Sequence, residues 1–410
     1  MSGLLINNNI QERYLIKNKK KILLNKFTKS SKSLFLDIDD QDKTPNVLSK
    51  NYRFNFKTND LNSFKKYNSI AIIGIGGSIL GYEAIYNFLQ KKSKKKIYFF
   101  NNLDLKKITS FKKKEKLEKI LFIVISKSGN TIETLSNFFS LNILKRNSKN
   151  IIIISEKKNN SLYKISTQFN LFYIEHKPNI GGRFSVLSEV GIVPAYLMGI
   201  DIKKIRLNTL EYLKKKNQFI LRDSVIKLAS LLYAKKIKNI VFLNYVPELE
   251  KFLFWCQQLL AESLGKNKKG FLPIVSNVPK DHHSLLQLYL DGPNDKIFYI
   301  FSDQNKNNEK AIVPQGLESV NFIKNTKLHE IKKTQKSALT KIFKKKYIPF
   351  REFKINFNNE ETIGELFSYF ILETILVAKL TNINPYDQPA VEQVKRLTKK
   401  LLTKNTKKYF

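Results

Sequence analysis

Short apolar segments bounded by polar turns recur along the chain, with stretches of helical spacing between them. The first set lies at residues 70–73, 96–101, 121–125, 151–155 and 171–174, and the second lies at 239–243, 272–275, 297–302 and 353–357. These segments lack alternation of apolar and polar residues, as expected for strands buried on both faces. Residues 80–89 and 131–144 place apolar side chains three and four apart, which predicts covering helices. Strands that alternate with helices in this way predict parallel sheets of the βαβ type.

The two sets of predicted strands indicate two α/β domains, each a doubly wound parallel sheet. A chain of 410 residues is long enough for two such cores. We expect an N-terminal extension over residues 1–45, a first domain over 46–204 and a second domain over 205–410, which ends in a helix near 391–402. Residues 203–238, between the two sets, have a mostly helical pattern. Because no low-complexity linker divides the chain, we expect the two domains to pack closely.

The strongly basic composition does not by itself indicate a partner. Lysine and arginine total 73 against 34 acidic residues, for a net charge of +39. Such a charge is typical of proteins that bind nucleic acid or a membrane surface. Here, however, the lysines occur in short runs along the whole chain among Asn, Ile, Phe and Tyr, without a recognisable nucleic-acid motif. We interpret the charge as a compositional bias of solvated faces, predict no specific nucleic-acid partner, and expect the field to attract anionic substrates.

The N-terminus and the cysteine content favour a cytoplasmic protein. Cys256 is the one cysteine and cannot form an intramolecular disulfide, which is typical of a reducing compartment. The first twenty residues lack the continuous apolar core of a signal peptide. No apolar segment reaches the length that spans a bilayer, so we predict no association with a membrane.

A glycine-rich turn follows the first predicted strand and opens a predicted helix. Gly74 and Gly76 fit the dinucleotide-binding pattern G-x-G-x-x-G, but Ile79 occupies the third glycine position. Gly77 and Ser78 still provide a close backbone approach and a hydroxyl group at the start of a helix. This combination suits a phosphate monoester better than the pyrophosphate of a dinucleotide.

A second turn, Ser-Lys-Ser-Gly-Asn-Thr at residues 126–131, follows the strand predicted at 121–125. Its hydroxyl groups, on Ser126, Ser128 and Thr131, lie where the unsatisfied N–H groups and the positive dipole end of a helix are expected. Helix capping is the alternative interpretation, but capping needs one hydroxyl rather than three. Because adjacent parallel strands end at the same sheet edge, we expect this turn and Ser78 to bind one phosphate.

The run at residues 126–131 resembles the phosphosugar-binding loop of sugar isomerase (SIS) domains. Further segments resemble the glucose-6-phosphate isomerase family: Gly-Gly-Arg-Phe-Ser at 181–185, Gln258 to Lys266, His-Ser-Leu-Leu-Gln at 283–287, and Tyr386 to Lys395. The matches occur in the family's order from residue 74 to residue 395. The resemblance implies two packed SIS-type domains (αβα sandwiches) and interconversion of D-glucose 6-phosphate and D-fructose 6-phosphate. It also implies a reaction by ring opening and proton transfer through a cis-enediol, with no cofactor and no metal.

The resemblance also assigns roles to individual residues. Glu262 becomes the base that moves the proton between C2 and C1, a task suited to a carboxylate. Arg183, always protonated and preceded by two glycines, becomes the group that stabilises the enediolate oxyanion. His283 and Lys395 become the residues for ring opening. The remaining positions are Gly77, Ser78, Ser126, Lys127, Ser128, Thr131, Gln258 and Gln388 for substrate binding, with Glu133 in a supporting role.

Some of these assignments leave alternatives open. His282 rivals His283 chemically, and only the spacing His-Ser-x-x-Gln selects His283. In the family this histidine comes from the neighbouring subunit, which implies a homodimer with shared active sites. Glu133 either pairs with Lys395 or Arg183, or is a plain carboxylate at a helix N-terminus. Gln388 faces the same side as Lys395 if one helix runs through both.

Three other functions remain as alternatives. A broader phosphosugar isomerase would also accept mannose 6-phosphate. A non-catalytic SIS-type sensor of sugar phosphates would need the phosphate loop but not Arg183, Glu262, His283 and Lys395 together. A nucleic-acid binder would rely on the basic surface and would lose affinity steeply as salt rises.

Overall fold

Two five-stranded sheets form the framework of the chain in this computed structural model, which describes residues 3–304 and 308–406. All strands of the first sheet are parallel, in the order β3-β2-β4-β5-β6. The second sheet has the order β1-β10-β9-β7-β8. The strands are β1 (Leu4–Asn9), β2 (Ser69–Ile73), β3 (Lys96–Phe100), β4 (Ile120–Ile125), β5 (Ile151–Ser155), β6 (Phe172–Glu175), β7 (Asn239–Asn244), β8 (Leu272–Asn277), β9 (Lys296–Asp303) and β10 (Phe350–Ile355).

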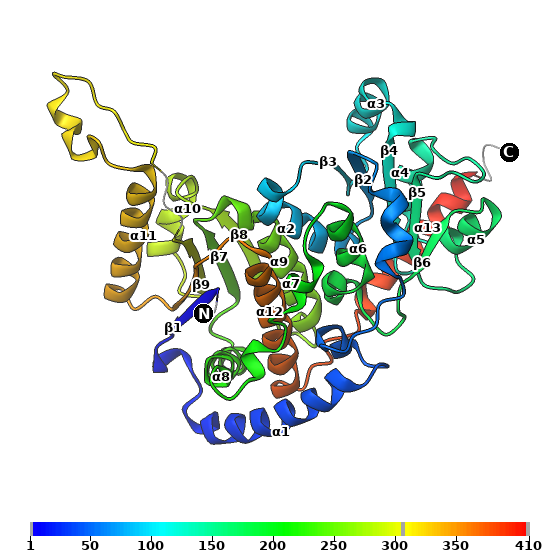
Figure 1. The fold of residues 1–410 in the computed structure, drawn as a ribbon. Helices are drawn as coiled ribbons and strands as arrows, with labels where there is room; N and C mark the ends of the chain where they lie inside the picture. The colour runs from blue at the N-terminus through cyan, green and yellow to red at the C-terminus, as the bar shows by residue number, and fades with distance from the viewer. Residues whose placement is uncertain (1–2, 305–307, 407–410) are drawn as a thin grey trace.

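Helices surround both sheets, so the predicted pair of doubly wound α/β domains is confirmed (Figure 1). The helix predicted over residues 80–89 has those bounds, whereas the one predicted over 131–144 already ends at Ser140. The α-helices are α1 (Lys20–Asp39), α2 (Leu80–Leu89), α3 (Leu105–Lys114), α4 (Ile132–Ser140), α5 (Ser161–Gln168), α6 (Glu189–Leu197), α7 (Ile202–Arg206), α8 (Gln218–Ala234), α9 (Glu250–Leu264), α10 (His282–Asp291), α11 (Leu328–Lys345), α12 (Glu360–Leu380) and α13 (Pro389–Thr406).

The N-terminal residues belong to the second sheet, which the sequence pattern did not reveal. Strand β1 pairs antiparallel with β10, and Ile6 lies opposite Phe353. Helix α1 then packs against α8 and α12 of the same half of the molecule. The expected N-terminal extension therefore contributes an edge strand and a helix to the second sheet's unit, while the domain boundary expected near residue 205 stays a prediction.

A shared apolar core joins the two halves of the molecule. Successive side chains of β2 alternate between two buried clusters, with Ile70 and Ile72 on one face of the sheet and Ala71 and Ile73 on the other. The cluster that contains Ile72 also contains Phe242 of β7, so one face of each sheet lies against the same core. Helices α2, α9 and α12 fill this core and contact one another. The predicted close packing of the domains is therefore confirmed.

The sheet order determines where a ligand site can form. In the first sheet β2 lies between β3 and β4, so the chain reverses its winding direction at β2. Ligands of open α/β sheets bind at the carboxyl ends of the strands beside such a reversal. The two turns singled out in the sequence follow β2 and β4 at this edge. Among the described residues, no helix is long and apolar enough to cross a membrane.

Candidate active site

The glycine-rich turn after β2 packs directly against the backbone of the Gly-Gly-Arg segment. Gly76 has a φ of +57°, a conformation that suits glycine. A Cβ atom on Gly77 would lie 2.3 Å from the carbonyl carbon of Gly182 and 2.6 Å from the nitrogen of Arg183. A side chain at Gly77 would therefore separate the two segments. Glycine is required here for contact between backbones, and this contact brings Arg183 to the turn.

The hydroxyl-rich turn after β4 gathers its side chains around Thr131. The Thr131 Oγ1 atom lies 2.8 Å from Ser126 Oγ and 3.4 Å from Ser128 Oγ. Thr131 occupies the N-cap position of α4, yet its side chain makes no capping hydrogen bond. Capping alone therefore does not account for the three hydroxyl groups. They face one another beside the N–H groups of the first turn of α4, an arrangement suited to an anion.

The two turns lie side by side at the sheet edge. Strands β2 and β4 pair in parallel register, with Ile73 opposite Val124. A Cβ atom on Gly74 would lie 3.0 Å from the carbonyl oxygen of Ile125, so the backbones remain close as the strands end. Ser78 and the hydroxyl cluster thus occupy neighbouring positions. The expected convergence of these residues on one phosphate remains a prediction that agrees with this geometry.

Arg183 is the most constrained polar side chain of the site, with only 2% of its surface exposed. Each of its five N–H donors has an acceptor. The acceptors are Ser263 Oγ at 2.8 Å from Nε, Glu262 Oε2 at 3.1 Å and Gln388 Oε1 at 3.0 Å from Nη1, and the carbonyl oxygens of Pro385 and Asp387 near Nη2. Burial lowers the pKa of the guanidinium, and the Glu262 carboxylate opposes that shift. Three segments distant in sequence therefore meet at one cation.

Glu262 and Gln258 lie one turn apart on the face of α9 that is turned away from the core. The opposite face of α9 buries Phe252, Trp255 and Leu259, which is the amphipathic spacing that fixes the helix orientation. Gln258 Nε2 donates to Glu262 Oε1 at 2.9 Å, and it lies 3.1 Å from the Cβ position of Gly76. Gln258 therefore orients the glutamate and touches the glycine-rich turn. Its side chain links the two halves of the site.

The two histidines at the start of α10 differ in their surroundings. His282 is partly buried, and its Nε2 atom lies 3.2 Å from the Tyr245 hydroxyl group. Burial lowers the pKa of His282, and the neighbouring His283 adds to that effect. His283 is exposed on the molecular surface. His282 therefore has a hydrogen-bonding partner within its own subunit, whereas His283 is accessible to another molecule.

Other predicted residues are not gathered around Arg183 in this structure. Lys395 lies on the exposed helix α13, where its Nζ atom pairs with Glu392 at 2.8 Å. Helix α13 begins at Pro389, so Gln388 precedes the helix and the condition for a shared helical face with Lys395 is not met. Arg183 pairs with Glu262 and Lys395 with Glu392, and neither of them pairs with Glu133.

Lys127 lies within the hydroxyl-rich turn, but its side chain points to other partners. Its Nζ atom donates to the carbonyl oxygen of Pro178 at 2.7 Å and lies 3.6 Å from Glu156 Oε1. Burial lowers the pKa of Lys127, and Glu156 partly offsets this effect. In this arrangement Lys127 anchors the turn to the following loops, and a direct contact with phosphate stays a prediction.

Comparison with known proteins identifies the family of this chain. A sequence model of the family described as phosphoglucose isomerase matches residues 57–409. This chain belongs to the phosphoglucose isomerase family. A probable glucose-6-phosphate isomerase of Methanococcus maripaludis is 36% identical over 84% of this chain and 81% of its own length. The glucose-6-phosphate isomerase of Methanocaldococcus jannaschii is 34% identical over 83% of this chain and 86% of its own length.

Two solved structures of lower sequence identity share the fold of this chain. A hypothetical protein of Thermus thermophilus superposes with a TM-score of 0.79 at 22% identity, covering 97% of this chain and all of its own. A glucose-6-phosphate isomerase of Chlamydia trachomatis superposes with a TM-score of 0.77 at 17% identity, covering 99% and 89% of the two chains. At these identities the likeness concerns the fold, and it extends over both domains.

In this member of the phosphoglucose isomerase family, some residues that contact Arg183 were given no role in the sequence analysis. Ser263 accepts from Arg183 Nε, and the carbonyl oxygens of Pro385 and Asp387 accept from Nη2. Ser263 follows Glu262 within a matched segment, so its position was a usable signal. Backbone carbonyl groups carry no sequence signal, because every residue has one.

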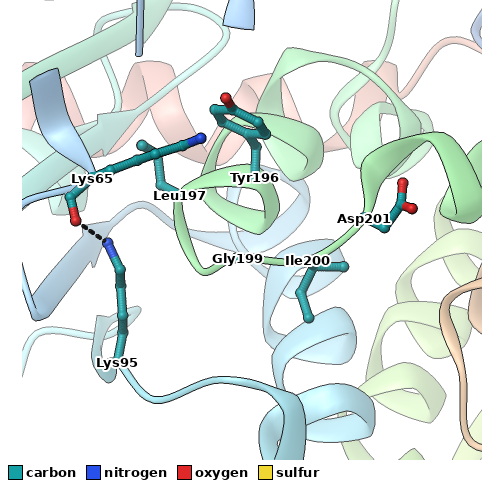
Figure 2. A pocket seen from close by; sticks show the side chains of 7 residues that line it. All are labelled: Lys65, Lys95, Tyr196, Leu197, Gly199, Ile200 and Asp201. Atoms are coloured by element: carbon teal, nitrogen blue, oxygen red, sulfur yellow. Dashed lines mark hydrogen bonds between the residues drawn. The ribbon is translucent and has the colours of Figure 1, made fainter. Parts of the chain in front are cut away.

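A hollow of about 350 Å³ lies elsewhere on this phosphoglucose isomerase family member (Figure 2). Lys65 and Lys95 line it and precede β2 and β3, so the hollow is at the amino ends of these strands. The Lys95 ammonium donates to the Lys65 carbonyl oxygen at 2.9 Å, and the Lys65 ammonium lies 4.3 Å from the centre of the Tyr196 ring. The Arg183 cluster, the glycine-rich turn and the hydroxyl-rich turn lie at the opposite edge of the sheet.

Proposed function

We propose that this chain is an aldose–ketose isomerase that interconverts D-glucose 6-phosphate and D-fructose 6-phosphate. The observation that carries the proposal is the meeting of Arg183, Glu262 and Gln388 beside two turns suited to a phosphate. Membership of the phosphoglucose isomerase family and relatives named glucose-6-phosphate isomerase support it.

The phosphate group is assigned to the neighbouring turns at the sheet edge. Ser126, Ser128 and Thr131 supply hydroxyl groups, and Ser78 adds another from the turn after β2. The N–H groups at the start of α4 face the same space with the positive end of the helix dipole. A phosphate held here leaves the sugar carbons free to reach the Arg183 cluster.

Proton transfer is assigned to Glu262. With glucose 6-phosphate opened to the aldehyde, the carboxylate removes the C2 proton, and the electron pair forms the C1–C2 double bond of an enediolate. Arg183 stabilises the negative oxygen, because a buried guanidinium interacts more strongly with a charge than it does in water. A proton passes from O2 to O1 of the enediolate, and Glu262 returns its proton to C1 as the C2 carbonyl group forms, which gives the ketose. The Glu262 carboxylate is 27% exposed, so it is accessible to the substrate.

Ring opening is assigned to His283 of a neighbouring subunit together with Lys395. An imidazole is suited to giving a proton to the ring oxygen, since its ordinary pKa lies near neutrality. The exposure of His283 and of all side chains described along α13 supports a homodimer in which a second copy covers these groups. The active site would then be completed only in the dimer.

The reaction itself is tested by a coupled assay that converts fructose 6-phosphate into glucose 6-phosphate. We expect turnover by the purified chain and a loss of about 10²- to 10⁴-fold in kcat for Glu262→Gln, because an amide cannot accept the proton. The matched control is Glu248→Gln in the turn before α9, which should keep wild-type activity. Full activity in the Glu262→Gln protein would overturn the proposed mechanism.

The shared active site is tested by mixing two inactive variants. Co-expressed Glu262→Gln and His283→Gln chains form heterodimers in which one of the two sites has both native residues. If dimers form at random, about a quarter of wild-type activity returns. An absence of recovery in purified heterodimers would contradict the assignment of His283 to the neighbouring subunit.

A further inference from the structure

Lys266, just after α9, holds the segment that leads into α13. Its side chain is only 13% exposed, and its Nζ atom lies 2.7 Å from Asp387 Oδ1. The same ammonium donates to the carbonyl oxygen of Asn384. The hydrogen bond from Lys266 lowers the pKa of Asp387, so this carboxylate remains charged at neutral pH. Lys266 therefore contacts the 384–388 segment twice, once at a backbone carbonyl group and once at a side chain.

Arg183 also donates hydrogen bonds to the 384–388 segment. Its Nη2 atom donates to the carbonyl oxygen of Asp387 at 3.1 Å, and its Nη1 atom donates to the side chain of Gln388 at 3.0 Å. Asp387 thus bonds Lys266 through its carboxylate and Arg183 through its carbonyl group. A shift of the Asp387 backbone away from Lys266 would move the carbonyl oxygen that Arg183 binds. The position of Arg183 is coupled to Lys266 through this one residue.

We propose that Lys266 is a positioning residue for the isomerisation, which sets Arg183 and Gln388 through Asp387. The inference rests on the proposed function, since it assigns to Arg183 the stabilisation of the enediolate. Among the described residues, the Lys266 side chain forms hydrogen bonds and an ion pair only with Asn384 and Asp387. Lys266 therefore affects the site through these residues and does not contact Arg183 or Gln388 by such a bond. A displacement of about 1 Å at such a group can reduce catalysis by about 10²-fold.

The ion pair contributes little to folding. Asp387 is 52% exposed, and ion pairs with an exposed partner contribute little to stability. Loss of Lys266 should therefore leave the thermal unfolding midpoint nearly unchanged. Loss of Lys266 should instead weaken the affinity of the site for a ligand that places a planar anion at the reacting carbons.

The test compares two ligands by calorimetric titration. Inorganic phosphate probes the turns after β2 and β4, and a six-carbon sugar acid 6-phosphate also places a carboxylate where the enediolate forms. We expect Lys266→Met to weaken binding of the sugar acid about tenfold, while the dissociation constant of phosphate changes less than twofold. Lys266→Arg, which keeps a cation and N–H donors, should return sugar-acid binding to within about threefold of wild type.

Lys268→Met is the matched control, because Lys268 is exposed in the same loop and its substitution removes the same charge. It should bind both ligands as the wild type does. If Lys266→Met does not fold, Asp387→Asn removes the same ion pair from its exposed side and should give the same tenfold loss.

Three results would overturn the inference: unchanged sugar-acid binding in Lys266→Met, an equal loss for both ligands, or an equal loss in Lys268→Met. Binding is measured without turnover, so failure of the proposed function can be distinguished from failure of the inference about Lys266. A wild-type chain that binds the sugar acid but does not isomerise would contradict only the assigned reaction. A wild-type chain that binds neither ligand would contradict both.

Discussion

At the scale of single residues, the paired histidines show how surroundings separate chemically equal side chains. His282 contacts Tyr245 within its own subunit, whereas His283 is exposed. We predict that His283→Gln lowers kcat for cyclic substrate by about 10²- to 10⁴-fold, the usual contribution of a general acid. His282→Gln should remain within about threefold of wild type, because an amide still reaches the Tyr245 hydroxyl group. Steady-state assays of both variants check this, and the reverse order of losses would identify His282 as the acid.

His176 gives a prediction about pH and stability. It is buried, and its Nδ1 atom lies 2.8 Å from the Lys177 carbonyl oxygen, which can only accept, so Nδ1 carries a hydrogen. Burial lowers the pKa of His176 to about 4, and Lys127 adds to the shift while Glu156 opposes it. The unfolded chain, with an ordinary pKa of about 6.5, binds a proton more readily between these values.

The free energy of unfolding should therefore fall as the pH drops from about 6.5 through about 4. A shift of this size corresponds to about 3 kcal/mol for His176 alone. His176→Asn keeps an N–H donor but cannot titrate, so its stability should depend less on pH in this window. Urea unfolding of both proteins at several pH values gives the comparison. Parallel pH profiles would contradict the assignment.

At the scale of elements, one buried arginine joins four of them. Arg351 of β10 forms an ion pair with Glu373 of α12 at 2.8 Å, and neither side chain is exposed. Its Nε atom donates to Asn8 of β1 at 2.7 Å, and Nη2 donates to Ser224 of α8 at 2.7 Å. The edge strand β1 is thus held by side-chain contacts as well as by its ladder with β10.

We predict that Arg351→Met lowers the free energy of unfolding by about 3–5 kcal/mol, because Glu373 is left buried without its partner. The double variant Arg351→Met, Glu373→Leu should regain most of this loss, since a buried apolar pair needs no desolvation of charge. Denaturant unfolding of both variants checks the prediction. A double variant as unstable as the single one would show that the network acts through more than this ion pair.

At the scale of the whole molecule, the net charge of +39 predicts a kinetic effect. A positive field raises the rate of encounter with an anionic sugar phosphate and is screened by salt. We predict that kcat/KM falls severalfold between about 20 and 200 mM NaCl, while kcat at saturating substrate changes little. Initial-rate measurements across this range check it. A constant kcat/KM would mean that the charge does not steer the substrate.

The sequence predicted the strands well where they are buried on both faces. Runs such as Ile120–Ile125 need no distant partner to be recognised, because continuous apolar residues between turns already indicate a central parallel strand. Strand β1 was missed because its sequence, LLINNN, ends in three asparagines and has mixed exposure. Its pairing with β10 joins residues almost 350 positions apart, which no local pattern can indicate.

The sequence by itself determined the two α/β units, the glycine-rich and hydroxyl-rich turns and the identity of the charged residues, because each depends on local periodicity or on a short motif. Tertiary structure alone decided which of them meet. Arg183 is satisfied by Glu262 from α9 and by the 384–388 segment before α13, contacts that exist only when both sheets share one core. It also placed Lys395 on an exposed helix rather than beside Arg183. The physical reason is that a buried cation takes the nearest well-oriented acceptors, and the packing of the whole chain sets which acceptors are near.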